Sequence, residues 1–260
     1  MSLLGTLTSS VSALDSFTTG LDAIGNNIAN VNTTAFKDSS VSFADTYSGL
    51  GTSVRGSTTN FSQGALSSTG TTTNLGISGN GYFILKDSVS GNVYATRDGQ
   101  FAFNSAGYLV NSQGYRVQGL AGGTLGDIKE GTPPTGATRQ AVSIDTSGNL
   151  VESYSDGTQA TTNQVLLQSY ATPSGLTSVG NNLYTNLAAG TPLTATLSAS
   201  NAPNQGGLGL IQSGTLEQSN VDLTKEFANM ITLQRAFEAN ARLITISDTV
   251  LESVVNMKTH

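Results

Sequence analysis

The chain has 260 residues and a formal net charge of −6, and 11% of its residues are charged, against roughly 25% in ordinary soluble domains. The negative balance argues against nucleic acid as a partner, because nucleic-acid binding needs basic patches, and the lack of cysteine excludes disulfides and thiolate metal sites. No apolar run approaches the roughly 20 residues of a membrane-spanning helix, and the start, "MSLLGTLTSS", lacks the basic region of a cleaved signal peptide, so we expect neither.

The first predicted element is an amphipathic helix over residues 1–31. One set of its apolar residues recurs every seven positions, at Leu7, Leu14, Leu21 and Ile28. Leu4 and Val11 interleave with this set, which predicts that both sets share one helical face. A helix of about 30 residues extends roughly 45 Å, and such an apolar face is unstable in water without a partner.

The second predicted element, residues 32–70, is a polar, extended connector with a few apolar anchors such as Phe36 and Phe43. Four asparagines lie where the helix meets this connector, within the run "IGNNIANVNTTAFK". Asparagine is a poor helix former because its side chain competes for backbone hydrogen bonds. One interpretation is therefore that these residues end the helix.

The middle of the chain, residues 71–220, is predicted to form one mostly antiparallel β domain. Short β-prone runs such as "GYFILKD" and "NQVLLQSYA" are separated by Gly, Asn, Asp and Ser. Between "YATR" and "QFAF", the dipeptide Asp98-Gly99 predicts a tight hairpin.

The last predicted element is a second amphipathic helix over residues 221–258. Its apolar residues again recur every seven positions, at Leu223, Met230, Phe237, Ile244 and Leu251. The alternating seam positions are expected at Phe227, Gln234, Ala241, Asp248 and Val255. Ser219 or Asp222 is expected to cap the first turn, with Glu226 near the positive end of the helix.

Two arrangements suit these terminal helices. In one, they are ordinary surface helices on a globular core; in the other, each covers the apolar seam of its partner. Because both are long and terminal, we favour an antiparallel coiled-coil pair. The predicted fold class is therefore α+β, with long N- and C-terminal helices paired as a coiled coil and one central β domain.

Residues for catalysis are scarce. The only histidine is His260, the last residue, which argues against a histidine-activated nucleophile. The carboxylates are scattered, and "GISGNG" precedes a strand-like run rather than the helix that a phosphate loop needs. We expect no enzyme activity, cofactor or metal. A carboxylate-based glycosidase and an adhesin-like binding module are the competing hypotheses, and neither explains the apolar seams at both ends.

Several stretches resemble one family, the bacterial flagellar rod and hook axial proteins. "GLDAIGNNIANVNTTAFKDSSVSFADTYS" is similar to the N-terminal signature of that family, and "SGTLEQSNVDLTKEFANMITLQRAFEAN" resembles its C-terminal part. The family usually has Gly where this chain has Ala35, which argues against a left-handed backbone there because positive φ is costly for alanine. The N-terminal likeness is carried by Asn26, Asn27, Ala29, Asn30, Thr33, Phe36 and Lys37.

The resemblance implies a structural subunit that polymerises helically into a hollow, torque-transmitting shaft. It favours a short hook-type subunit, with a distal or proximal rod subunit as the alternative. It also implies export from the cytoplasm by the flagellar type III apparatus, and contacts with further copies of the chain, other axial proteins and the hook cap. In such a tube, Asn26, Asn27 and Asn30 are expected to contact neighbouring subunits, because uncharged amides avoid the cost of burying charge.

Overall fold

The computed structural model describes residues 3–46, 51–194 and 197–258, without the side chains of Leu3, Leu4 and Lys258. His260 and the seam position of the Leu4 side chain thus lie outside the described part. The chain divides into two compact units. The helical unit comprises Met1–Asn32, Lys37–Ser62 and Asn220–His260, and the β unit comprises Thr33–Phe36 and Gln63–Ser219.

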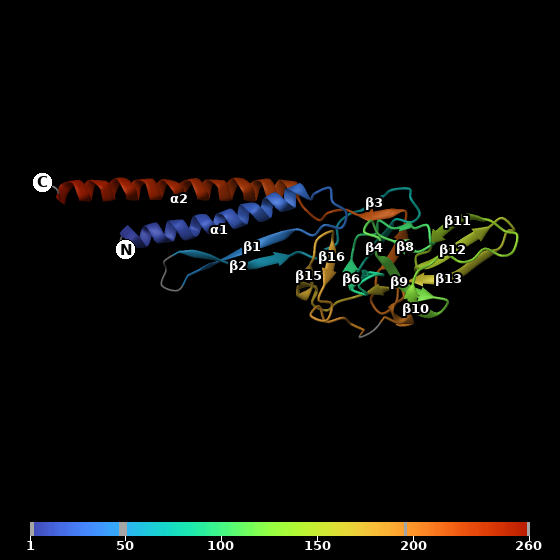
Figure 1. Ribbon diagram of the computed structural model, residues 1–260. Coiled ribbons are helices and arrows are strands. Elements are labelled where there is room, and N and C mark those ends of the chain that lie inside the picture. The colour runs from blue at the N-terminus through green and yellow to red at the C-terminus, as the bar shows by residue number, and fades with distance from the viewer. Residues whose placement is uncertain (1–2, 47–50, 195–196, 259–260) are drawn as a thin grey trace. The chain divides into compact units, whose positions relative to one another are not determined.

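The helical unit consists of two helices and a hairpin (Figure 1). Helix α1 spans Leu3–Ala29 and α2 spans Leu223–Lys258, and they run antiparallel side by side (Figure 1). Strands β1 (Ser39–Asp45) and β2 (Thr52–Thr59) form an antiparallel hairpin with an irregularity between Ser42 and Phe43. This hairpin occupies much of the stretch that we expected to be an extended connector.

The hairpin is attached to α1 by specific contacts. The Ser16 hydroxyl donates to the Thr52 carbonyl at 3.0 Å, and the Thr52 amide donates to the Ser12 hydroxyl at 3.1 Å. The rings of Phe17 and Phe43 meet edge to face at 6.1 Å. A polar, β-branched stretch with few apolar residues therefore becomes ordered because α1 supplies its partners.

Both helices use a different second seam position from the predicted one. In α1, Val11 is 57% exposed, whereas Ser10 and Ile24 are buried. In α2, the buried Glu226 and Ser247 each lie three residues after a predicted seam residue, whereas Phe227 is 49% exposed. The second row of the seam therefore lies three residues after the residues of the seven-residue repeat, not four. Small side chains in this row let the elements approach closely.

Helix α2 begins as expected. The Asp222 carboxylate accepts hydrogen bonds from the amides of Thr224 at 2.9 Å and Lys225 at 3.3 Å. These bonds satisfy two of the four amides that a helix start leaves without intrahelical partners.

The β unit holds a large antiparallel sheet ordered β11-β12-β13-β9-β5-β6-β16-β15, with β10 and β8 on β9, β7 on β8 and β14 on β5. Two further pairs, β17 with β4 and β18 with β3, complete it. The strands are β3 (Leu66–Ser68), β4 (Leu75–Ser78), β5 (Tyr82–Lys86), β6 (Val93–Thr96), β7 (Ala102–Phe103), β8 (Leu109–Val110), β9 (Arg116–Ala121), β10 (Thr124–Asp127), β11 (Arg139–Ile144), β12 (Asn149–Tyr154), β13 (Gln159–Val165), β14 (Leu167–Gln168), β15 (Thr177–Ser178), β16 (Leu183–Thr185), β17 (Leu210–Ser213) and β18 (Thr215–Glu217). Two 3-10 turns lie at Pro173–Gly175 and Ala199–Asn201. The α+β class is confirmed.

The core of the β unit is centred on β5. Phe83 and Leu85 are fully buried, and Phe83 meets Phe101 edge to face at 5.1 Å. Apolar residues from β4, β8, β9, β11, β12, β13, β14, β16 and β17 also belong to the cluster. The β-prone runs "GYFILKD" and "NQVLLQSYA" therefore supply buried residues of this core, Phe83 and Leu85 from the first and Val165 and Leu167 from the second.

The predicted hairpin at Asp98-Gly99 is wrong. Strand β6, which precedes it, pairs with β5 and β16, whereas β7 pairs with β8. Gly99 is needed for another reason: a Cβ there would lie 1.7 Å from the Leu75 carbonyl oxygen. The dipeptide thus permits close approach to β4 instead of reversing the chain.

Ala35 adopts the left-handed conformation that its residue type argued against, with φ of 56°. Its amide donates to the Glu217 carbonyl at 2.8 Å, and its side chain is 1% exposed. The hydrogen bond and the burial of the methyl group offset the backbone cost, which is roughly 1–2 kcal/mol for a non-glycine residue.

Replacing Ala35 by valine should lower the free energy of unfolding of the β unit by at least about 2 kcal/mol, because a β-branched residue resists positive φ and its extra methyl groups meet a packed surface. Ala35→Gly is the matched control, and we expect it to stay within about 1 kcal/mol of the wild type since relief of strain opposes loss of the methyl group. Urea unfolding measures both. Equal stability of the valine variant would contradict the left-handed geometry.

Candidate assembly surface

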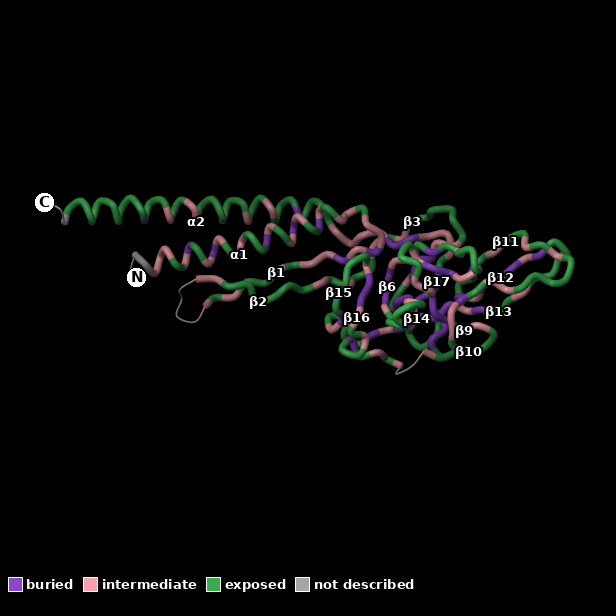
Figure 2. Tube along the Cα trace, viewed as in Figure 1, coloured by how far each residue is buried: buried purple, intermediate pink, exposed green. Residues whose placement is uncertain are grey.

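The surface of α2 is strongly apolar for a helix that faces water. Figure 2 shows exposed residues along most of its length. Large contiguous apolar patches on a soluble chain mark interaction sites. The exposed apolar side chains are Leu223, Phe227, Ile231, Phe237, Leu243, Ile246, Val250, Leu251, Val254, Val255 and Met257.

Part of this surface forms a second stripe that we did not predict. In the C-terminal half of α2, exposed apolar residues recur at steps of three and four: Leu243, Ile246, Val250, Val254 and Met257. Such spacing places them on one face of the helix. The period was visible in the sequence, but the stronger seven-residue repeat masked it.

A groove of about 280 Å³ lies within the helical unit, between α1, β1 and α2. It is lined by Gly20 and Ile24 of α1, Phe43 of β1, and Glu226 and Leu233 of α2, among others. Gly20 makes the close packing possible, since a Cβ there would lie 2.9 Å from Leu233 Cδ1. The groove is therefore part of the contact that joins the two ends of the chain.

The predicted seam residues lie at or near this contact. Leu223, Phe237 and Leu251 are 39%, 36% and 37% exposed, so they lie at its edge. The others are half-buried: Leu7, Leu14, Leu21, Ile28, Met230 and Ile244. Their role in assembly stays a prediction.

The asparagines of α1 have separate roles. Asn27 is 1% exposed; its Nδ2 donates to the Ser39 carbonyl at 2.8 Å and its Oδ1 accepts from the Ser39 amide at 3.0 Å. Asn27 thus fastens β1 to α1 within one copy, and its contact with a neighbouring subunit stays a prediction. Asn30 Nδ2 donates to Asn26 Oδ1 at 2.9 Å, and both lie at the end of the helix.

Two further motif residues, Phe36 and Lys37, belong to different units. Lys37 is buried in the helical unit, where its Nζ donates to the Ser62 carbonyl at 2.7 Å. This bond satisfies a charge that burial would otherwise penalise. Phe36 is half-buried in the β unit. Within one copy the ammonium of Lys37 thus has a partner in its own chain, and a contact of Phe36 or Lys37 with another subunit stays a prediction.

Glu217 joins several segments of the β unit. Its side chain accepts from the Gly64 amide at 2.9 Å and pairs with Arg97 at 3.3 Å, while its carbonyl accepts from Ala35. Arg97 and Glu217 expose 6% and 0% of their side chains. Loss of one member of a buried pair leaves an uncompensated charge, so this contact holds the segments of the β unit in place. The sequence did not predict it.

A cluster of three tyrosines lies on one side of this ion pair, with Tyr82 in contact with Arg97. The Arg97 guanidinium lies 5.1 Å from the centre of the Tyr82 ring, which meets Tyr170 and Tyr184 edge to face. Burial raises the pKa of Tyr82 from 10.0 to about 12, and the positive charge of Arg97 opposes part of that rise. Burial likewise raises the pKa of Tyr170 and of Tyr184.

The described residues offer no obvious catalytic or metal site. No group of three or more His, Cys, Asp or Glu side chains among them is placed to hold a metal ion. Glu130 and Glu152 lie near each other, but both pair with Arg139, and Glu152 also accepts from the Gly131 amide and the Tyr154 hydroxyl. These carboxylates therefore serve a structural purpose. Within the described ranges, no helix combines the length and apolar character of a membrane span.

Comparison with known families finds three matches along the chain. Residues 7–37 match "Flagella basal body rod protein", and residues 76–153 match "Flagellar hook protein FlgE/F/G D1 domain". Residues 212–257 match "Flagellar basal body rod FlgEFG protein C-terminal". The first and last matches cover most of α1 and α2, and the middle one lies within the β unit.

Individual relatives carry the same names. The flagellar basal-body rod protein FlgG of Bacillus subtilis (strain 168) is 40% identical over 278 residues, covering 98% of this chain and 100% of that protein. FlgG of Borreliella burgdorferi is 31% identical, covering 92% of each chain. The flagellar hook protein FlgE of Escherichia coli (strain K12) is 44% identical over 130 residues, covering 48% of this chain and 32% of that protein.

Replacing Asn27 by alanine should lower the free energy of unfolding of the helical unit by about 1–3 kcal/mol, because it leaves the Ser39 amide and carbonyl without their partners. The change should also increase amide exchange in β1. Asn26→Ala is the matched control, since Asn26 is exposed and should cost less than about 0.5 kcal/mol. Equal stability of the two variants would contradict the fastening role of Asn27.

The stability of the β unit should fall as pH rises from 10 to 12. An unfolded tyrosine ionises near pH 10, whereas Tyr82 in the folded chain holds its proton to about pH 12. A raised folded pKa contributes stability that is complete below the unfolded pKa and lost as pH passes the folded pKa, here about 2–3 kcal/mol. Denaturant unfolding across this range measures the fall. In the Tyr82→Phe variant, the free energy of unfolding should decrease less between pH 10 and pH 12. A decrease equal to that of the wild type would exclude Tyr82 as its source.

Proposed function

The chain belongs to the family of bacterial flagellar rod and hook axial proteins, and we propose that it is a rod-type structural subunit that polymerises into the shaft of the flagellar basal body. The polymer would be hollow and would transmit torque along the shaft.

The rod assignment replaces the hook-type subunit favoured by sequence motifs. Relatives named rod protein align along nearly the whole of both chains, as with the B. subtilis protein. Relatives named hook protein match less completely: the E. coli match covers 32% of that protein, and the Salmonella typhimurium hook protein is 26% identical over 404 aligned residues. A chain with one β unit therefore suits the rod class better. The 44% identity to part of the E. coli hook protein keeps a hook subunit as the second candidate.

The observation that carries a polymerising role is the exposed apolar surface of α2. Each large apolar side chain buried on assembly contributes about 1.5–3 kcal/mol, and many such residues line this one helix. A single copy leaves them in water, whereas a helical array of copies buries them repeatedly. This requirement supports self-association over the enzyme and adhesin hypotheses, neither of which uses such a surface.

The remaining aspects of function follow from family membership. We propose that the chain is exported from the cytoplasm by the flagellar type III apparatus without a cleaved signal peptide. Its partners would be copies of itself, adjoining axial proteins and the cap under which they assemble. Its role is structural, without cofactor, nucleic acid or membrane insertion.

Electron microscopy of the purified full-length chain under polymerising conditions tests this function. We expect straight tubes, which characterise a rod subunit. Curved tubes would favour the hook candidate, and the absence of polymer at any concentration would contradict self-assembly. The substitution Val254→Asp provides a structure-matched comparison, because it places a charge on the exposed face of α2, where Val254 is 52% exposed. It should abolish tubes and leave the monomer's stability within about 0.5 kcal/mol.

A further inference from the structure

The outward face of α1 carries all of its charge. Asp15 and Asp22 are the charged residues of this helix, and both are exposed. They are seven residues apart, which is about two turns or 10.5 Å. Val11, 57% exposed, precedes Asp15 by one turn on the same side. The buried side of the helix, which includes Ala13, faces the opposite way.

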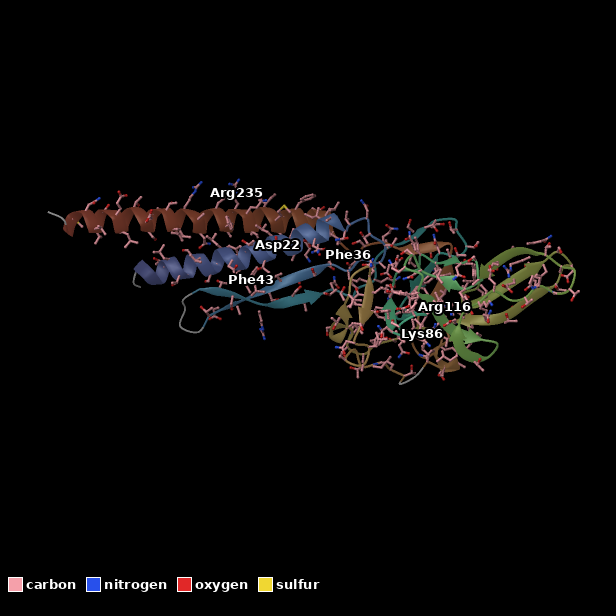
Figure 3. All side chains as sticks on the ribbon, in the orientation of Figure 1. Asp22, Phe36, Phe43, Lys86, Arg116 and Arg235 are labelled. Atoms are coloured by element: carbon pink, nitrogen blue, oxygen red, sulfur yellow. The ribbon has the colours of Figure 1, made fainter. Side chains whose placement is uncertain are left out.

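The outward face of α2 carries the complementary charge at the same spacing. Arg235 and Arg242 are exposed and also seven residues apart. Figure 3 shows Arg235 on the side of α2 that faces away from α1. Ile246, 59% exposed, follows Arg242 by one turn. Arg235 pairs with Glu238 on its own helix, but these side chains are 77% and 54% exposed, and an exposed pair of this kind exchanges readily.

We propose that the outward face of α1 in one copy docks on the outward face of α2 in the next, with Asp22 paired to Arg235 and Asp15 to Arg242. The proposal rests on the proposed self-assembly and names the surfaces that perform it. The partner is a second copy because the two faces have opposite charge and equal spacing. Within one copy, Arg235 lies on the side of α2 that faces away from α1 (Figure 3), so the two faces do not meet.

A single antiparallel register satisfies three contacts at once. With Asp22 opposite Arg235, the equal spacing sets Asp15 opposite Arg242, and Val11 then lies opposite Ile246. Within one copy, Gly20 packs against Leu233, so Asp22 lies about level with Ile231. The neighbouring copy is therefore displaced along the helix axis by about four residues, or ~6 Å.

This contact joins two different surfaces, so it leaves an unused α1 face at one end and an unused α2 face at the other. A contact between unlike surfaces that does not close into a ring builds an open helical polymer. Opposite charges also reject wrong registers, because a shift of one turn removes both pairs. The two charge pairs thus fix the direction and the stagger of neighbouring copies, which a uniformly apolar surface would leave open.

Charge reversal in the full-length chain tests the pairing. Asp15→Lys with Asp22→Lys, and separately Arg235→Glu with Arg242→Glu, should each raise the concentration needed for polymer by at least about tenfold. An equimolar mixture of the two variants should polymerise, because each then meets the opposite charge on its neighbour. Asp248→Lys with Glu252→Lys makes the same change in net charge as the aspartate-to-lysine variant, but elsewhere on α2, and should polymerise like the wild type. If the mixture does not recover, or if this control fails equally, the pairing is overturned.

The lack of cysteine in the chain allows a direct test of the register. A chain with both Val11→Cys and Ile246→Cys should form a ladder of covalent oligomers on oxidation, because a disulfide needs Cα atoms about 4.4–6.8 Å apart. Thr18→Cys with Ile246→Cys is two turns out of register and should give no ladder. Wild-type polymer with no ladder in either variant overturns the docking and leaves the proposed function intact. Failure of the wild type to polymerise overturns the proposed function as well.

Discussion

Helix α2 carries more apolar surface than its own chain covers. Its inner side packs on α1, through Leu233 against Gly20, yet Phe227, Val250 and Met257 remain exposed. An apolar helix face left in water is unfavourable in proportion to its area. The helical unit is therefore folded by its own contacts, but it leaves apolar side chains of α2 in water. In the proposed polymer, other copies of the chain would cover them.

The β unit follows the opposite principle. Its core around Phe83 is closed, and the buried Arg97–Glu217 pair links segments that are distant in sequence. Such a pair stabilises little relative to an apolar replacement, but removal of either partner is costly. It therefore specifies one arrangement of those segments. The two units therefore differ in role: the β unit has a closed core, and the helical unit presents a surface for other copies.

Particular residues show how far sequence patterns reach. The repeat of Leu7, Leu14, Leu21 and Ile28 predicted the first helix, and the same period predicted α2. The second seam position was misjudged: the spacing placed the apolar Phe227 in the seam, whereas its neighbour Glu226 is buried there. In the structure, the buried positions are those where the packed elements approach each other closely, and small or partly polar side chains fit better there. Asp98-Gly99 failed for a similar reason, since Gly99 allows contact with Leu75 and does not turn the chain.

The sequence by itself determined the fold class, the two terminal helices, the absence of cysteine chemistry and the family, because these depend on periodicity, composition and local motifs. Only the tertiary structure decided that Asn27 fastens a hairpin, that Ala35 accepts a left-handed backbone, and that Glu217 joins distant segments. Each of these depends on a partner far along the chain, which local spacing does not encode. For the charged residues on the outward faces of α1 and α2, the sequence shows their spacing. Only the packed helices show on which side of each helix they lie.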